Sequence, residues 1–206
     1  MTAHRSTHEV FPVPRRPPAG PLPRPSLALD VTVFAFVNSV PFLVAWTLLG
    51  VFPKGCFCAF NHHHQHVATF ESPMLNRVLE QVYALETGVF SNGWVLHHAL
   101  GHHMHYLDQK KDESGWVDGN GRTMGAFRYT VWNAVLAYPR AWRVGRKHKK
   151  HRPALVGSAL FILTLLAVLL VWRPLPTLFV FVLPMTISFF GTVYATHAHH
   201  AGNSTA

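Results

Sequence analysis

Three long apolar segments constrain this chain more than any other feature of its sequence. They cover residues 31–52, 154–172 and 177–195, and each is about as long as a helix that crosses a hydrocarbon core of roughly 30 Å. Three such helices buried in a soluble protein would need more polar sequence around them than a chain with 13% charged residues provides. We therefore expect an all-α integral membrane protein with about three spanning helices.

The first 27 residues differ from the rest of the chain. They contain seven prolines and four arginines without apolar periodicity, so we expect a disordered tail followed by one membrane domain over residues 28–206. Pro41 lies in the middle of the first apolar segment and is expected to kink that helix. Cys56 and Cys58 are expected to be free thiols.

The distribution of positive charge indicates which parts of the chain face the cytoplasm. Thirteen of the eighteen Lys and Arg residues lie between positions 54 and 152, which assigns the stretch between the first two spans to the cytoplasmic side. Three spans would leave the tail outside, although its arginines favour the inside. Either the tail is translocated or the first segment does not cross fully, and the sequence leaves this open.

The region between the first two spans carries further helix signals. Ser72-Pro73 is typical of a helix start, and a second helix is expected from about Trp94. The aromatic and basic residues 127–142 favour a helix in the membrane interface, and the basic run over 140–152 would meet anionic lipid head groups. No nucleic-acid-binding motif accompanies this run, so no nucleic-acid partner is expected.

Twelve of the sixteen histidines fall into three clusters at residues 62–66, 97–105 and 197–200. His62 and His66 have the i, i+4 spacing that places two side chains on one helix face, and His98 and His102 repeat it with His103 adjacent. Imidazole binds iron, zinc, copper and nickel. The expected topology brings the three clusters to one membrane face, which predicts a shared metal site.

Two other functions compete with a constructed metal site. Histidine tracts can simply sequester metal, but these clusters are short and interrupted by apolar residues. A metal transporter should carry ionisable residues within its spans, and the second and third segments contain none except Tyr194. A membrane metal-binding protein stays an alternative.

The clusters resemble the histidine boxes of the membrane fatty acid desaturase and hydroxylase superfamily. Residues 62–66 resemble its HxxxH box, and residues 98–103 are similar to its second box, spaced HxxxHH here where HxxHH is more usual. Asn61 and residues 106–109 are similar to a bacterial desaturase-like subgroup. The resemblance implies two non-haem irons, an external redox partner that donates electrons, and a lipid or acyl-chain substrate. It also implies a bacterial inner-membrane location with the boxes facing the cytoplasm.

Desaturation is the reaction expected first, with hydroxylation as the alternative within the superfamily. The family's last box normally follows well after the last membrane pair, whereas this sequence ends at Ala206. Either the third cluster takes over, or the chain is an inactive truncated remnant. Asp108 and Asp112 are expected to orient ligand imidazoles or to be solvated loop charges. The metal ligands implied are His62, His66, His98, His102, His103, His199 and His200.

Overall fold

The computed structural model describes residues 24–106 and 108–200, except for the side chains of residues 24, 199 and 200. Within this part of the chain the fold is helical, apart from one isolated bridge between Val117 and Thr123, which confirms the predicted all-α class. In chain order the elements are α1 (Arg24–Phe36), α2 (Val40–His66), α3 (Pro73–Thr87), η1 (Val95–His102), η2 (His103–His105), α4 (Ala126–Lys147), η3 (Lys149–His151), α5 (Arg152–Trp172), α6 (Pro174–Thr177), η4 (Leu178–Val182) and α7 (Leu183–His200).

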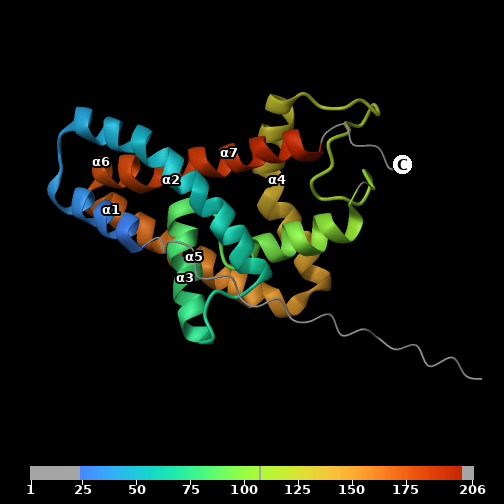
Figure 1. The fold of residues 1–206 in the computed structure, drawn as a ribbon, viewed down its shortest axis with the longest axis horizontal. Coiled ribbons are helices and arrows are strands. Elements are labelled where there is room, and N and C mark those ends of the chain that lie inside the picture. The colour runs from blue at the N-terminus through green and yellow to red at the C-terminus, as the bar shows by residue number, and fades with distance from the viewer. Residues whose placement is uncertain (1–23, 107, 201–206) are drawn as a thin grey trace, which may run out of the picture.

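Among the described residues, three stretches of helix are long and apolar enough to cross a membrane: Val40–His66, Lys149–Trp172 and Pro174–Ala198. They run along one another, while α3 and α4 cross them (Figure 1). The second and third contain the predicted spans 154–172 and 177–195. The chain reverses at Arg173 between them, where the sequence predicted a short link.

The first predicted span is wrong in its boundaries, because the helix stops at Phe36 and restarts at Val40. Pro41 lies in the first turn of α2 and has no N–H to bond to the carbonyl of Val37. The guanidinium of Arg173 donates to that carbonyl instead at 3.2 Å, and to the carbonyls of Phe34 and Ala35. Pro41 therefore marks a break between two helices rather than a kink within one.

Helix α1 folds back along α2 instead of extending it. Its thirteen residues span about 20 Å, which is short of a hydrocarbon core. Residues 24–27, predicted as the end of the tail, form its first turn, and the rest of the predicted tail lies outside the described residues.

A buried ion-pair cluster, which we call the latch, joins α1, α2 and α3. The ammonium of Lys54 lies 2.7 Å from Asp30 Oδ2 and 2.5 Å from Glu86 Oε2, and all three side chains are at most 3% exposed. The indole of Trp46 donates to Asp30 Oδ1 at 2.8 Å. Around the latch packs an apolar core with the buried members Val33, Phe34, Leu43, Ala84, Leu85, Ile162, Leu166, Val180 and Phe181.

Helix α3 begins as the sequence predicts, since the Ser72 hydroxyl accepts from the backbone N–H of Leu75. The helix predicted over residues 127–142 is α4, on which Phe127, Trp132 and Val135 are exposed, and its place in the membrane interface stays a prediction. Cys56 and Cys58 are both free thiols, as predicted.

The inner face of α4 holds the loop that follows η2. The Arg140 guanidinium donates to the carbonyl of Glu113, and the buried Tyr129 hydroxyl donates to the carbonyl of Ser114 at 3.3 Å. Asn133 accepts from the same guanidinium through its side-chain oxygen. These bonds fix the loop against the end of the bundle, next to the histidines of η1.

Candidate metal centre

The first pair of predicted ligands lies on the last two turns of α2. The ring centroids of His62 and His66 are 4.8 Å apart, which is the geometry that the i, i+4 spacing gives on a helix. His62 is half-buried and His66 is exposed. Helix α2 continues far enough beyond its apolar part to carry both residues, so the pair is attached to a rigid element.

The second cluster begins on a π-helix, η1, and ends on the short helix η2, rather than lying on the α-helix that the spacing suggested. In a π-helix the bonded partner is five residues away, so side chains at i and i+5 lie side by side. The ring centroids of His98 and His103 are accordingly 4.3 Å apart, closer than the 5.2 Å between His98 and His102. Short π-helical turns often occur at functional sites.

The two clusters face each other across the contact between α2 and η1. The ring of His98 lies 4.5 Å from that of His62 and 5.9 Å from that of His66, and His66 lies 5.7 Å from His103. Ligand nitrogens of His62, His66 and His98 all lie within 4.8 Å of one another. One ion could bind all three imidazoles after small side-chain movements.

Gln65, between the histidines of the first box, connects the two elements. Its side-chain amide donates to Asn61 Oδ1 at 2.9 Å, and its oxygen accepts from the backbone N–H of Val95 at 3.3 Å. Trp94 fills the corner beside them, with its ring 5.9 Å from His62 and 5.7 Å from His98. Sequence reasoning assigned no role to Gln65 or Trp94, although both lie within a few residues of the clusters.

Asp112 orients the imidazole of His102, which is one of the two roles expected for it from the sequence. Its Oδ1 lies 2.7 Å from His102 Nδ1 and also accepts from the backbone N–H of Ser114. A carboxylate at Nδ1 holds the proton there and places the lone pair of the imidazole on Nε2. Asp108 instead pairs with Lys111 at 2.9 Å on the surface, so it is a loop charge.

The loop can approach η1 closely only because residue 101 is glycine. The backbone N–H of Glu113 donates to the carbonyl of Gly101 at 3.2 Å. A Cβ at position 101 would lie 2.8 Å from Glu113 Cγ, which is closer than carbon atoms pack. The glycine in the second box thus allows the contact that brings Asp112 to His102.

Two clustered histidines have other partners. His64 faces α3, where its Nδ1 lies 2.8 Å from the Thr69 hydroxyl, so it stands apart from the facing pairs. His197 lies against α4, with Nε2 3.0 Å from the carbonyl of Met124 and its ring 5.2 Å from that of Tyr129. The predicted ligands His199 and His200 lie on α7, but their side chains are outside the described part of the structure.

Burial keeps the central histidines neutral. The pKa of His98 is lowered from 6.5 to about 2, chiefly by removal from water and in smaller part by repulsion from His62, His103 and His102. The pKa of His103 is lowered by the same two causes. Neutral imidazole is the form that binds a metal, so the residues present fit a metal ion at neutral pH.

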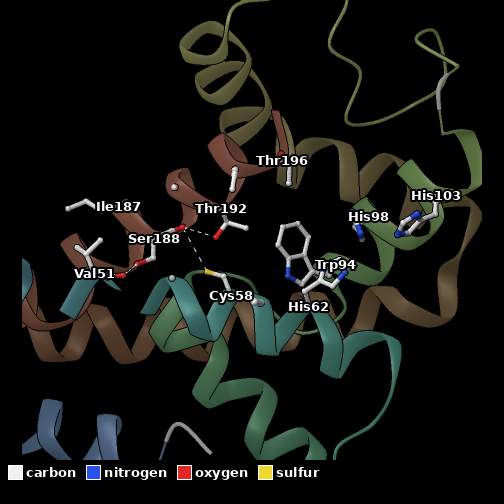
Figure 2. A pocket seen from close by; sticks show the side chains of 14 residues that line it. Val51, Cys58, His62, Trp94, His98, His103, Ile187, Ser188, Thr192 and Thr196 are labelled. Atoms are coloured by element: carbon white, nitrogen blue, oxygen red, sulfur yellow. Dashed lines mark hydrogen bonds between the residues drawn. The ribbon is translucent and has the colours of Figure 1, made fainter. Parts of the chain in front are cut away.

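A cavity of about 730 Å³ leads from the histidines along the contact between α2 and α7. His62, His98 and His103 lie at one end of it and Val51 and Ile187 at the other (Figure 2). Its lining is mostly apolar, and its volume is within the roughly 300–1,000 Å³ of small-molecule sites.

The fold and this site together define a helical membrane protein with a histidine cluster at the end of an apolar cavity. Residues 38–206 match the family model described as fatty acid desaturase, and the chain belongs to that family. It is therefore a desaturase-like membrane protein of an oxidoreductase family for which non-haem iron is implied. No curated protein and no solved structure matches the chain.

Proposed function

We propose that this protein is an oxygen-dependent desaturase of lipid acyl chains, with two non-haem irons and an external electron donor. The observation that supports this most directly is the apolar cavity with His62, His98 and His103 at its end. A long apolar substrate lying in it would have one carbon segment beside the histidines. The ligands we propose are His62, His66, His98, His102, His103, His199 and His200.

The last two of these ligands are proposed from their positions on α7. Ala195 and Thr196 line the cavity. On the same helix, His199 follows Ala195 by four residues and His200 follows Thr196 by four residues. Residues four apart lie on the same helix face, so this spacing favours a third group of ligands at the same end of the cavity.

The polar side chains of the cavity wall offer little to a polar ligand. The Thr192 hydroxyl donates to the carbonyl of Ser188 at 2.9 Å, and the Ser188 hydroxyl donates to the carbonyl of Val51 at 3.3 Å. Because each hydroxyl donates its proton to backbone, the wall presents mainly carbon. Away from the histidines, this chemistry favours a hydrocarbon chain over a sugar or a nucleotide.

When bound, the iron pair supplies the activation of dioxygen and the removal of hydrogen from an unactivated C–H bond, which protein side chains cannot perform. The protein positions the substrate and keeps the imidazoles neutral. Trp94 holds His62 and His98 at the cavity wall, and Asp112 holds the His102 ring in one orientation. The apolar wall excludes water from the segment of the chain that reacts.

Lipid analysis tests this proposal. We expect cells that make the protein to contain an unsaturated acyl chain that is absent from cells making the His98→Ala variant. A hydroxylated chain in its place would assign the protein to the other reaction of the superfamily. Unchanged lipids despite a full complement of iron would refute the proposal.

Two glycine substitutions test whether the cavity is the substrate site. Gly191 lines the cavity and Gly157 lies on the exposed side of α5, and a Cβ at either position would meet nothing within 4 Å. Both positions therefore accept a leucine without a clash at Cβ. We expect Gly191→Leu to lower product formation at least about 10-fold with its metal retained, whereas Gly157→Leu should match the wild type. Equal activity in both variants would place the substrate elsewhere.

A further inference from the structure

A second pocket, of about 270 Å³, lies against η1 and differs from the first in its charge. The end of η1, the loop after η2 and the last turns of α4 form its walls. Its lining residues are Leu100, Gly101, His105, Lys110, Lys111, Glu113, Arg143, Val144, Lys147 and His148. We call it the basic pocket.

Four exposed cations converge on the basic pocket, two from the loop and two from α4. They are Lys110, Lys111, Arg143 and Lys147. The single carboxylate of the lining, Glu113, has Arg140 and Arg143 within 4 Å, at 3.8 and 3.9 Å. Lys111 is paired with Asp108 at 2.9 Å, but Lys110 and Lys147 add positive charge beyond these pairs. The pocket therefore carries a net positive charge, which attracts an anionic surface and speeds its approach.

The basic pocket and the apolar cavity lie on different faces of the same short helix. Gly101 lines the basic pocket, while His98 and His103 line the cavity. A helix with its side chains is roughly 10–12 Å across, so little more than one helix separates the basic pocket from the histidine cluster. Electrons arriving at this surface would have a short path to a metal at the cluster.

Apolar side chains lie on the surface next to the basic pocket. Met104 is 67% exposed and Tyr106 is 42% exposed, and the Tyr106 ring is 5.2 Å from that of His102. A small apolar patch with a charged rim is typical of protein interfaces. The loop after η2 extends past the end of α7 (Figure 1), away from the length of the bundle that would lie in lipid.

We propose that the basic pocket, with Met104 and Tyr106, is the docking surface of an acidic one-electron carrier protein. This rests on the proposed function. Reduction of one dioxygen to two waters, coupled to removal of two hydrogens from the substrate, needs two further electrons and two protons. Two reduced carriers would therefore dock in turn, and each would be oxidised by one electron while solvent supplies the protons.

Lipid head groups are the competing anionic partner for these cations. Lys149 and Lys150 lie where α5 enters its apolar run, so head groups would meet them first. Lys110 and Lys147 instead face one concave pocket and come from two different elements. That arrangement favours a protruding acidic partner over a flat membrane surface.

The test compares two pairs of charge reversals with the same change in net charge. Lys110→Glu with Lys147→Glu alters the basic pocket, and Lys149→Glu with Lys150→Glu alters exposed lysines outside it. The probe is an acidic plant-type [2Fe–2S] ferredoxin, whose binding to the purified protein is measured by fluorescence anisotropy. We expect the pocket pair to weaken binding at least 10-fold and the control pair less than 3-fold, with wild-type binding weakened by salt.

Three results would overturn the proposal. In the first, ferredoxin does not bind the wild type, and in the second, both double variants weaken its binding equally. In the third, the double variant of the basic pocket loses affinity for short-chain phosphatidylglycerol but not for ferredoxin. Binding needs neither iron nor turnover, so these results are independent of the proposed reaction. Suppose that both double variants contain iron, form product and accept electrons from ferredoxin at the same rate. That result would refute this docking surface and leave the proposed function intact.

Discussion

Helix α2 contributes to two clusters of polar side chains, the latch at Lys54 and the histidine cluster at His62, and their chemistry differs. In the latch, a cation lies between two carboxyl groups, so each of them has an opposite charge beside it. In the histidine cluster, three imidazoles direct nitrogens to within 4.8 Å of one another, and no carboxylate from the described part of the chain joins the group. Opposite charges in contact hold helices together, whereas a group of imidazoles, which all offer an electron pair, suits the binding of a metal ion.

Breaking the latch should give the largest loss of stability. Lys54→Met leaves Asp30 and Glu86 without their cation in a buried site, and removal of one partner from such a pair costs about 3–5 kcal/mol. In a chain of this length that corresponds to a fall in Tm of roughly 6–20 °C, measured by thermal unfolding in detergent.

The same variant carrying Asp30→Asn and Glu86→Gln provides the control. Without the two carboxylates, most of the lost stability should return, because no buried charge is left unpaired. The metal content of folded Lys54→Met should equal that of the wild type. A Tm within 2 °C of the wild type for Lys54→Met would contradict a structural role for the latch.

Removing a central histidine should mainly affect metal binding, whereas breaking the latch mainly affects stability. His98→Ala is expected to weaken metal binding at least about 100-fold, or roughly 2.7 kcal/mol, because the His98 ring contacts both His62 and His66. Metal affinity is measured by competition with a chelator. His63→Ala is the matched control, since His63 is exposed and lies outside the group of three. If both variants kept the wild-type affinity, the metal would bind elsewhere.

A smaller effect is expected from the carboxylate behind His102. Asp112→Asn keeps the shape of the side chain but removes the charge that orients the imidazole, which should weaken metal binding about 10- to 100-fold. Asp108→Asn should leave affinity unchanged, because Asp108 pairs with a surface lysine. Equal metal affinities for the two variants would show that Asp112 does not support metal binding.

The smallest effect concerns the pH dependence of the metal-free protein. The pKa of His98 is near 6.5 in an unfolded chain and is lowered to about 2 by burial, so below pH 6.5 only the unfolded state takes up this proton. The contribution of His98 to the free energy of unfolding is therefore present above pH 6.5 and is lost as the pH falls below that value. Between pH 7 and 5 the wild type should lose about 1–2 kcal/mol relative to His98→Asn. Parallel stability curves for the two proteins would show that His98 is not buried as described.

Much of the fold followed from the sequence, because hydropathy over long windows and helix-start signals are local. The second and third spans and the start of α3 at Ser72 were predicted on those grounds, and helix α4 was predicted from its mixture of aromatic and basic residues. The break at residues 37–39 was not, since it depends on Arg173, which is distant in sequence and caps the end of α1. Local hydropathy does not distinguish a kinked span from a hairpin of two helices.

The parts of the site that depend only on helical spacing could be predicted from the sequence. The parts that depend on tertiary contacts could not. The spacing of His62 and His66 gave their common face, but the π-helix that aligns His98 with His103 has no counterpart in the sequence pattern. The partner of Asp112 depends on a loop held by α4. Gln65 offered a weak signal, as an amide between two histidines, and its bond to Val95 required the structure.

Iron K-edge X-ray absorption of the purified protein tests the central claim most directly, namely that imidazoles from α2 and η1 bind a shared metal. We predict about two irons per chain, with several imidazole nitrogens in the first coordination sphere and a signal that His98→Ala loses while His63→Ala keeps. Protein that contains zinc or no metal, or iron without imidazole ligands, would contradict the account.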